Sequence, residues 1–216
     1  MRRPQSGFTL IELLIVISII GLLAAVLLPE ILGGQDAANR LADQQNLSRH
    51  FQWFTIYQSK HRQTLPNEGG HKFVLATWTS GIFDHTEENF DRYFTPGIRE
   101  NDAAWLDQRK LVQKGEDPWP DLKSTTSQDT HYAGRAKAHM LTRTAGADEA
   151  WMANDNEGVW SLRDGTVNVL FNGGTVRSYS YQDLQERYAL GKFDKNNPIQ
   201  TWGPNSPIPE CQKLDQ

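Results

Sequence analysis

The sequence predicts an α+β protein in which one long N-terminal helix, membrane-spanning in its first half, packs on a small antiparallel β-sheet. Three observations carry this prediction: an uncharged run from Leu13 to Leu28, a helical repeat of apolar residues after it, and two β-rich runs late in the chain. A length of 216 residues suits one anchor and one soluble domain of ordinary size. The mean hydropathy of -0.60 shows that the remainder is markedly polar.

The apolar run, counted back to Phe8, has roughly the 20 residues that a helix needs to cross a bilayer. Glu12 is the one charged residue in it, and a carboxylate inside a membrane costs about 2.5–3.5 kcal/mol unless it is paired. A cut between Gly7 and Phe8 would create an α-ammonium on Phe8. That ammonium can pair with Glu12 of the same or a neighbouring subunit, strongly so in a low dielectric.

The stretch Gly7-Phe8-Thr9-Leu10-Ile11-Glu12-Leu13, behind the basic Arg2 and Arg3, resembles the class III signal of type IV pilins and type II secretion pseudopilins. The resemblance implies a pilin-like fold. It also implies that a prepilin peptidase cuts after Gly7 and methylates Phe8, and that Glu12 serves assembly. Pro29 stands where many family members carry a helix-bending proline.

Two other interpretations of the run fit less well. An ordinary secretory signal peptide has a shorter apolar core and a small-residue cleavage site after it, whereas Leu27-Leu28-Pro29-Glu30 follows here. An uncleaved signal anchor leaves Glu12 unexplained.

These features divide the chain into five parts. We expect a leader at 1–7, the membrane-spanning part of the helix at 8–29, its amphipathic continuation at 30–64, a globular α+β domain at 65–193 and an extended tail at 194–216. Arg2 and Arg3 favour a cytoplasmic N-terminus, so the soluble domain is expected outside the cytoplasm, on an inner-membrane anchor.

The helix is expected to continue past Pro29 and the flexible Gly33-Gly34 pair to about residue 62. Its apolar stripe, expected to pack on the globular domain, comprises Ala37, Ala38, Leu41, Leu47, Phe51 and Phe54. Its polar side, expected to face water or neighbouring subunits, comprises Asp36, Asn39, Arg40, Asp43, Gln44 and Gln45. Pro66 and Gly69-Gly70 end the helix in a tight reversal.

The middle of the chain alternates apolar segments with polar ones. Residues 72–79 read as a strand or a short helix, and 86–94 as a short helix capped by Thr86. Residues 99–135 are polar and predict a long surface excursion, although Trp105 and Trp119 argue against full disorder.

The late β signal consists of a strand at 158–162 and a hairpin of 167–171 with 175–179 around Asn172-Gly173-Gly174. A short helix is expected at 183–188. The hairpin is similar to C-terminal hairpins of many pilin-like proteins. Cys211 is the one cysteine, so an intrachain disulfide is excluded, and we expect a passive residue in a loose tail.

Sequence motifs for catalysis are missing, so the chain is not expected to be an enzyme. The six histidines are scattered, and neither HExxH, GxSxG nor a Walker loop occurs. No cofactor is expected apart from a weak calcium hypothesis at Asp155 and Glu157, for which a polar turn is the simpler interpretation. With a formal charge of -4 and no Lys or Arg run, no nucleic-acid partner is indicated.

The family resemblance implies a structural subunit that joins other pilin or pseudopilin subunits at an inner-membrane assembly platform. Two functions stay open: a type II secretion pseudopilus in the periplasm, or a type IV pilus at the cell surface for adhesion, motility or DNA uptake. The lack of paired cysteines and the turn at Pro66-Asn67-Glu68-Gly69 favour the first, and the long segment at 99–135 favours the second.

Overall fold

The computed structural model describes residues 9–140, 146–156 and 160–216, and the chain divides into two compact units between Ala38 and Asn39. Helix α1 (Leu10–Lys60) runs through both and contains Pro29 in its interior without interruption. The expectation that the helix continues past Pro29 is therefore confirmed, whereas a bend at Pro29 stays a prediction.

In the first unit, the large apolar side chains of α1 are exposed to solvent. Large apolar residues from Leu10 to Leu32 are exposed, with Leu10 at 89% and Leu22 at 69%. An 18-residue window of the helix has a mean hydropathy of 2.9 and none of it is buried. By length and composition this helix can cross a membrane.

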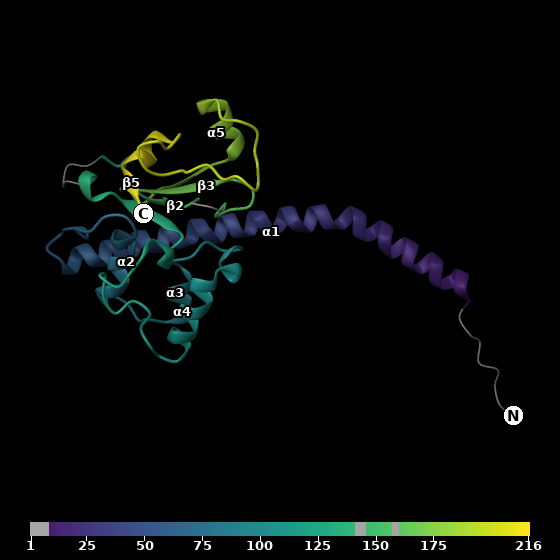
Figure 1. The fold of residues 1–216 in the computed structure, drawn as a ribbon, viewed down its shortest axis with the longest axis horizontal. Helices are drawn as coiled ribbons and strands as arrows, with labels where there is room; N and C mark the ends of the chain where they lie inside the picture. The colour runs from purple at the N-terminus through teal and green to yellow at the C-terminus, as the bar shows by residue number, and fades with distance from the viewer. Residues whose placement is uncertain (1–8, 141–145, 157–159) are drawn as a thin grey trace. The chain divides into compact units, whose positions relative to one another are not determined.

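The second unit holds a five-stranded antiparallel sheet in the order β4-β3-β2-β1-β5. Its strands are β1 (Tyr132–Arg135), β2 (Ala150–Asn154), β3 (Val167–Phe171), β4 (Val176–Tyr179) and β5 (Leu214–Asp215). In Figure 1 the sheet and α5 (Tyr181–Tyr188) lie on one side of the C-terminal half of α1, and α3 (Glu87–Asp91) and α4 (Ala103–Gln113) on the other. The predicted α+β fold with a small antiparallel sheet is confirmed.

The predicted hairpin is present as β3 and β4, paired from Val167 opposite Tyr179 to Leu170 opposite Val176. Residues 72–79 form helix α2 (His71–Thr79), which decides between the two interpretations left open. The helix α3 begins where it was expected, because the Thr86 hydroxyl accepts the N–H of Asn89 at 3.2 Å.

The expected surface excursion at 99–135 is wrong in its main point, because this segment is largely folded. It contains α4, whose N-cap residue is Asp102, and ends in β1, which lies between β2 and β5. Short 3-10 turns at Arg99–Asn101 and Ser127–Asp129 connect these elements. Trp105 and Trp119 are buried, at 7% and 1% exposure, as is usual for large aromatic side chains in a folded domain.

Two expectations near the C-terminus also need correction. Residues 160–162 of the expected strand are not in a strand, and 158–159 lie outside the described residues. The expected tail contributes a 3-10 turn at Pro209–Lys213 and the strand β5. Cys211 is fully buried in the core rather than in a loose tail, and burial raises the pKa of its thiol.

The buried face of α1 matches the expected stripe at Leu47 and Phe54 and differs from it elsewhere. It comprises Asp43, Asn46, Leu47, His50, Trp53 and Phe54, which recur at helical spacing. Leu41 is instead 56% exposed. The apolar contacts of this face include the ring of Phe54, edge-on to Trp151 of β2 at 5.3 Å between centroids. Asp43, which was expected on the polar side of the helix, is therefore part of its buried face.

Candidate functional site

The first candidate site is the start of α1, where Thr9 and Glu12 bind each other. The Thr9 N–H and hydroxyl each donate to Glu12 Oε2 at 2.8 Å, and the Glu12 N–H donates to the Thr9 hydroxyl at 3.3 Å. This is a capping box, in which an N-cap Thr and a Glu three residues later satisfy backbone groups reciprocally. The Thr-x-x-Glu spacing at positions 9–12 signals it, but sequence reasoning assigned Glu12 to assembly alone.

Of the other residues predicted for this site, Gly7 and Phe8 lie outside the described residues. Cleavage, methylation and the Phe8–Glu12 pairing therefore stay predictions. In the isolated chain the Glu12 carboxylate is held at its own helix start, which adds negative charge where the helix dipole is positive.

The second candidate site is a buried polar cluster centred on Asp43, where α1 meets the sheet. The Tyr132 hydroxyl donates to Asp43 Oδ1 at 2.6 Å. The side-chain amides of Asn154 and Asn168 donate to Oδ2 at 2.8 and 2.6 Å. One fully buried carboxyl group on α1 thereby joins three neighbouring strands, β1, β2 and β3.

Burial raises the pKa of Asp43, although the three donors oppose the shift. A second buried titratable group of α1, His50, donates from Nε2 to the Arg92 carbonyl at 3.0 Å, and burial lowers its pKa to about 3. His50 is therefore neutral at ordinary pH. The hydrogen bonds of Asp43 fix the rotation and axial position of α1 on the sheet, and the bond of His50 joins α1 to the end of α3.

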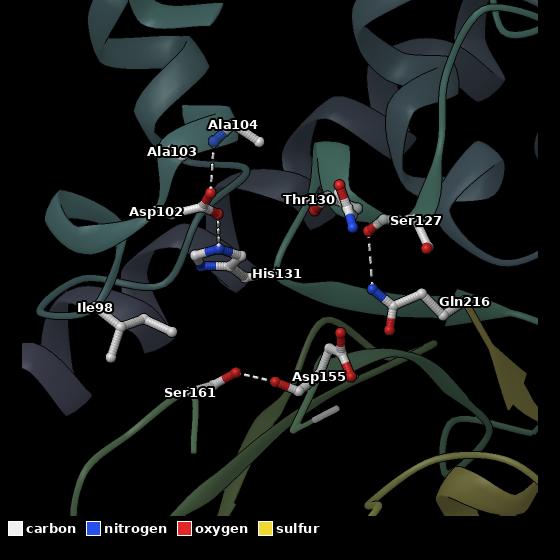
Figure 2. Close-up of a pocket in the computed structure, with 11 residues that line it drawn as sticks. Ile98, Asp102, Ala103, Ala104, Ser127, Thr130, His131, Asp155, Ser161 and Gln216 are labelled. Atoms are coloured by element: carbon white, nitrogen blue, oxygen red, sulfur yellow. Dashed lines mark hydrogen bonds and ion pairs between the residues drawn. The ribbon is translucent and has the colours of Figure 1, made fainter. Parts of the chain in front are cut away.

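A third candidate is a cavity of about 520 Å³ between the start of α4 and the ends of β1 and β2 (Figure 2). His131 Nε2 lies 2.7 Å from Asp102 Oδ2, and the Thr95 N–H donates to His131 Nδ1 at 3.1 Å. Since Nδ1 accepts, the ring proton is on Nε2 and is donated to Asp102. This bond is the main cause that lowers the pKa of Asp102, which also caps α4 through the N–H of Ala104.

Nucleophilic catalysis has no geometric support in this cavity. The Ser161 hydroxyl donates to the Asp155 carbonyl rather than to His131. Both ring nitrogens of His131 already have partners. A Ser–His–Asp relay would need the histidine to accept the serine proton, and the described contacts leave no such arrangement.

Metal ligation was predicted weakly at Asp155 and Glu157. The carboxylate of Asp155 accepts the indole N–H of Trp202 at 2.7 Å, and Glu157 lies outside the described residues. Within ranges 9–140, 146–156 and 160–216, no group of three or more His, Cys, Asp or Glu side chains is placed to hold a metal ion. Calcium binding stays a prediction.

Comparison with known proteins bears on the first site. Residues 2–28 match the family described as the prokaryotic N-terminal methylation motif. The chain is 41% identical over 66 residues to the type IV wide pilus major component of Thermus thermophilus, covering 31% of this chain and 50% of that protein.

The chain is also similar to the type II secretion system core protein G of two organisms. The identity is 51% over 37 residues for Pseudomonas aeruginosa, covering 17% of this chain and 26% of that protein. It is 46% over 39 residues for Klebsiella michiganensis, covering 18% and 28%. The chain thus matches half or less of the length of these relatives, and no solved structure matches it.

Proposed function

We propose that this protein, a member of the type IV pilin and type II secretion pseudopilin family by its N-terminal methylation motif, is a structural subunit of a type II secretion pseudopilus. In this proposal a prepilin peptidase cuts the chain after Gly7 and methylates Phe8. The subunit then leaves the inner membrane and joins other pilin or pseudopilin subunits at an inner-membrane assembly platform.

The observation that carries the proposal is the exposed apolar surface of the N-terminal half of α1. Its side chains from Leu10 to Leu32 are exposed, yet an apolar surface of this extent is not stable in water. A bilayer covers it before assembly, and the same helices of neighbouring subunits cover it in a filament. Arg2 and Arg3 favour a cytoplasmic N-terminus in this proposal.

The choice between the two assemblies rests on smaller differences. Two of the relatives are type II secretion core proteins, and the one cysteine of this chain is buried. The type IV pilus is the second candidate, supported by the similarity over 66 residues to a pilus component. The segment 99–135 does not favour it, since this segment forms α4 and β1 rather than one long recognition loop. A structural rather than an enzymatic role fits the occupied nitrogens of His131.

The secreted proteome of a deletion strain, measured against its parent by quantitative mass spectrometry, tests the proposed assembly. We expect a set of exported proteins to disappear from the medium and to accumulate in the periplasm. Complementation with the intact gene should restore both. An unchanged secretome together with missing surface filaments would replace the pseudopilus by the pilus.

Processing at Gly7 makes a separate prediction. Gly7→Val places a branched side chain at the residue before the cut, and we expect the chain to keep its leader. Intact-mass measurement of the membrane-extracted protein reads this out, since the mature chain begins at a methylated Phe8. Gly21→Ala is the matched control, because a Cβ at Gly21 meets nothing within 4 Å and should leave processing intact. A mature chain from Gly7→Val would contradict the assignment.

A further inference from the structure

A groove of about 650 Å³ beside helix α5 has no role in the proposed function. Four separate parts of the second unit line it: Arg40 of α1, the turn at 164–166, Ser180 with the first turns of α5, and Phe193. Its volume lies within the range of about 300–1,000 Å³ that is typical of small-molecule sites. Because its walls come from distant segments, the fold as a whole shapes this groove.

Phe193 presents an aromatic ring to the groove. The ring lies against Gly165, where a Cβ would come within 2.6 Å of Phe193 Cε2. The centroid of the ring is 5.0 Å from that of Tyr181 and 5.4 Å from that of Trp160, and both of these neighbours are buried. Phe193 itself stays 41% exposed. The ring is thus packed on one side and accessible on the other.

Two hydrogen bonds hold the backbone on either side of Phe193. The Tyr181 hydroxyl donates to the Gly191 carbonyl at 3.0 Å, and the Trp160 indole N–H donates to the Asp194 carbonyl at 2.8 Å. A ligand that packs on the ring therefore does not have to order it first, and preorganisation of this kind favours binding. An accessible ring beside polar groups suits a ligand with one apolar face and a polar edge.

The charges of the groove favour a neutral ligand. Among the described residues that line it, Arg40 is the one cation, and it forms an ion pair with Asp164 at 3.2 Å. The second carboxylate, Glu186, accepts a hydrogen bond from the Gln182 amide at 3.1 Å and is exposed to water, which screens its charge. Neither an unpaired cation nor a buried carboxylate is left among these side chains to select a charged ligand.

The polar groups that remain available include both donors and acceptors. Within the part of the chain that the structure describes, the half-buried Gln185 amide has no hydrogen-bond partner, so it can donate and accept. Arg40 uses one guanidinium nitrogen for Asp164, and Glu186 uses one oxygen for Gln182. A hydroxyl group also both donates and accepts, so a ligand with several hydroxyl groups matches this set.

We propose that this groove binds a neutral oligosaccharide of β-1,4-linked, glucose-type pyranose rings. The ring substituents are equatorial in such a sugar, so its axial C–H groups form an apolar face, and this face packs on Phe193. The hydroxyl groups at the edge of the ring bind Gln185, Arg40 and Glu186. The proposal adds ligand binding to a structural subunit, and it does not depend on which filament the protein joins.

Saturation-transfer difference NMR of the full-length protein, in micelles of a detergent without a sugar headgroup, tests the proposal. The probes are cellotriose and triacetylchitotriose, and sorbitol at equal hydroxyl concentration is the control, because it has similar hydroxyl groups but no ring. For a dissociation constant of about 1 mM, the signals of at least one trisaccharide should exceed those of sorbitol by about fivefold or more. Equal signals from all three compounds would overturn the proposal.

The two trisaccharides distinguish the possible sources of the sugar. A stronger signal from triacetylchitotriose would assign an N-acetylated glycan, and a stronger signal from cellotriose would assign a glucan. Either result supports the proposal, because the two probes share the pyranose geometry and differ in their acetamido groups.

Variants locate the binding. Phe193→Leu keeps an apolar side chain against Gly165 but removes the flat ring, so the trisaccharide signal should fall by about threefold or more. Leu106→Ala is the matched control, because Leu106 is also 41% exposed but lies on α4, outside the groove, and this variant should keep the signal. If Phe193→Leu fails to fold, Gln185→Ala takes its place and should lower the signal as well.

Two outcomes would contradict the proposal. The first is an unchanged trisaccharide signal in both groove variants. The second is a Phe193→Leu chain that forms less filament while its trisaccharide signal stays intact, because the groove then faces a neighbouring subunit rather than a sugar.

Discussion

Replacing Asp43 by alanine should lower the free energy of unfolding by about 3–5 kcal/mol, a large fraction of the stability of an ordinary domain. The substitution removes the one acceptor for three buried donors, on Tyr132, Asn154 and Asn168. Each of these donors would lose its acceptor in the protein interior, where Asp43 has an exposure of 0%. Urea unfolding of the full chain in micelles, followed by tryptophan fluorescence, measures the loss, since all seven tryptophans lie at residue 53 or beyond.

Two further variants separate the polar cluster from general damage to α1. Gln45→Ala changes an exposed residue two positions away and should alter stability by less than about 0.5 kcal/mol. Asp43→Asn keeps one oxygen for the amides of Asn154 and Asn168, and the new amide can donate to the Tyr132 oxygen. Its cost should be nearer 1 kcal/mol, as for one altered hydrogen bond. Equal losses for Asp43→Ala and Gln45→Ala would refute the role of the cluster.

The pH dependence of stability gives the same cluster a second signature. Burial raises the pKa of Asp43 above its usual value near 4 in the unfolded chain. Between these two values the folded state binds more protons than the unfolded state, so stability falls as pH rises through this window. Asp43→Asn removes the titrating group, and its stability relative to the native chain should therefore improve from pH 4 upward.

The same residue shows why sequence reasoning placed the helix but not its orientation. An apolar run and a repeat of three and four residues identify a helix reliably, and α1 is found at Leu10–Lys60. The repeat also puts a polar Asp43 on the outside, since a carboxylate is rarely buried. Asp43 can be buried because donors on three different strands bind its carboxylate. No local sequence pattern predicts that residues 132, 154 and 168 lie next to it.

The sheet was predictable only where its strands follow each other directly. The β3–β4 hairpin has two β-rich runs around a glycine turn, and this local pattern predicted it correctly. The strand β1 is the four residues Tyr132–Arg135 with every position buried, so it shows no alternation, and β5 has two residues. Their pairing depends on contacts between Arg135 and Leu214, distant in sequence. Close approach also fixes Gly134, where a Cβ would lie 2.3 Å from the Gly70 carbonyl oxygen.

Glu12 was the opposite case, since its place as the one carboxylate of the apolar run was evident from the sequence but its local partner Thr9 was not. Pairing of Glu12 with the Phe8 ammonium of a neighbour should make Glu12→Ala assemble at least tenfold less filament, corresponding to about 1.4 kcal/mol or more. The soluble domain should stay folded, because the described contacts of Glu12 involve Thr9 alone. Sheared or cross-linked filament, quantified against total subunit by immunoblot, measures the loss.

The capping box supplies the variant that decides what Glu12 does. Glutamine serves as the third residue of a capping box as glutamate does, so Glu12→Gln keeps the helix start but removes the charge. Thr9→Ala does the reverse, because it removes the hydroxyl bonds to Glu12 and keeps the carboxylate. If charge pairing drives assembly, Glu12→Gln should fail like Glu12→Ala, whereas Thr9→Ala should assemble nearly as the native chain does. If Glu12→Gln assembles normally and Thr9→Ala does not, Glu12 acts by capping its own helix, and the pairing with Phe8 is wrong.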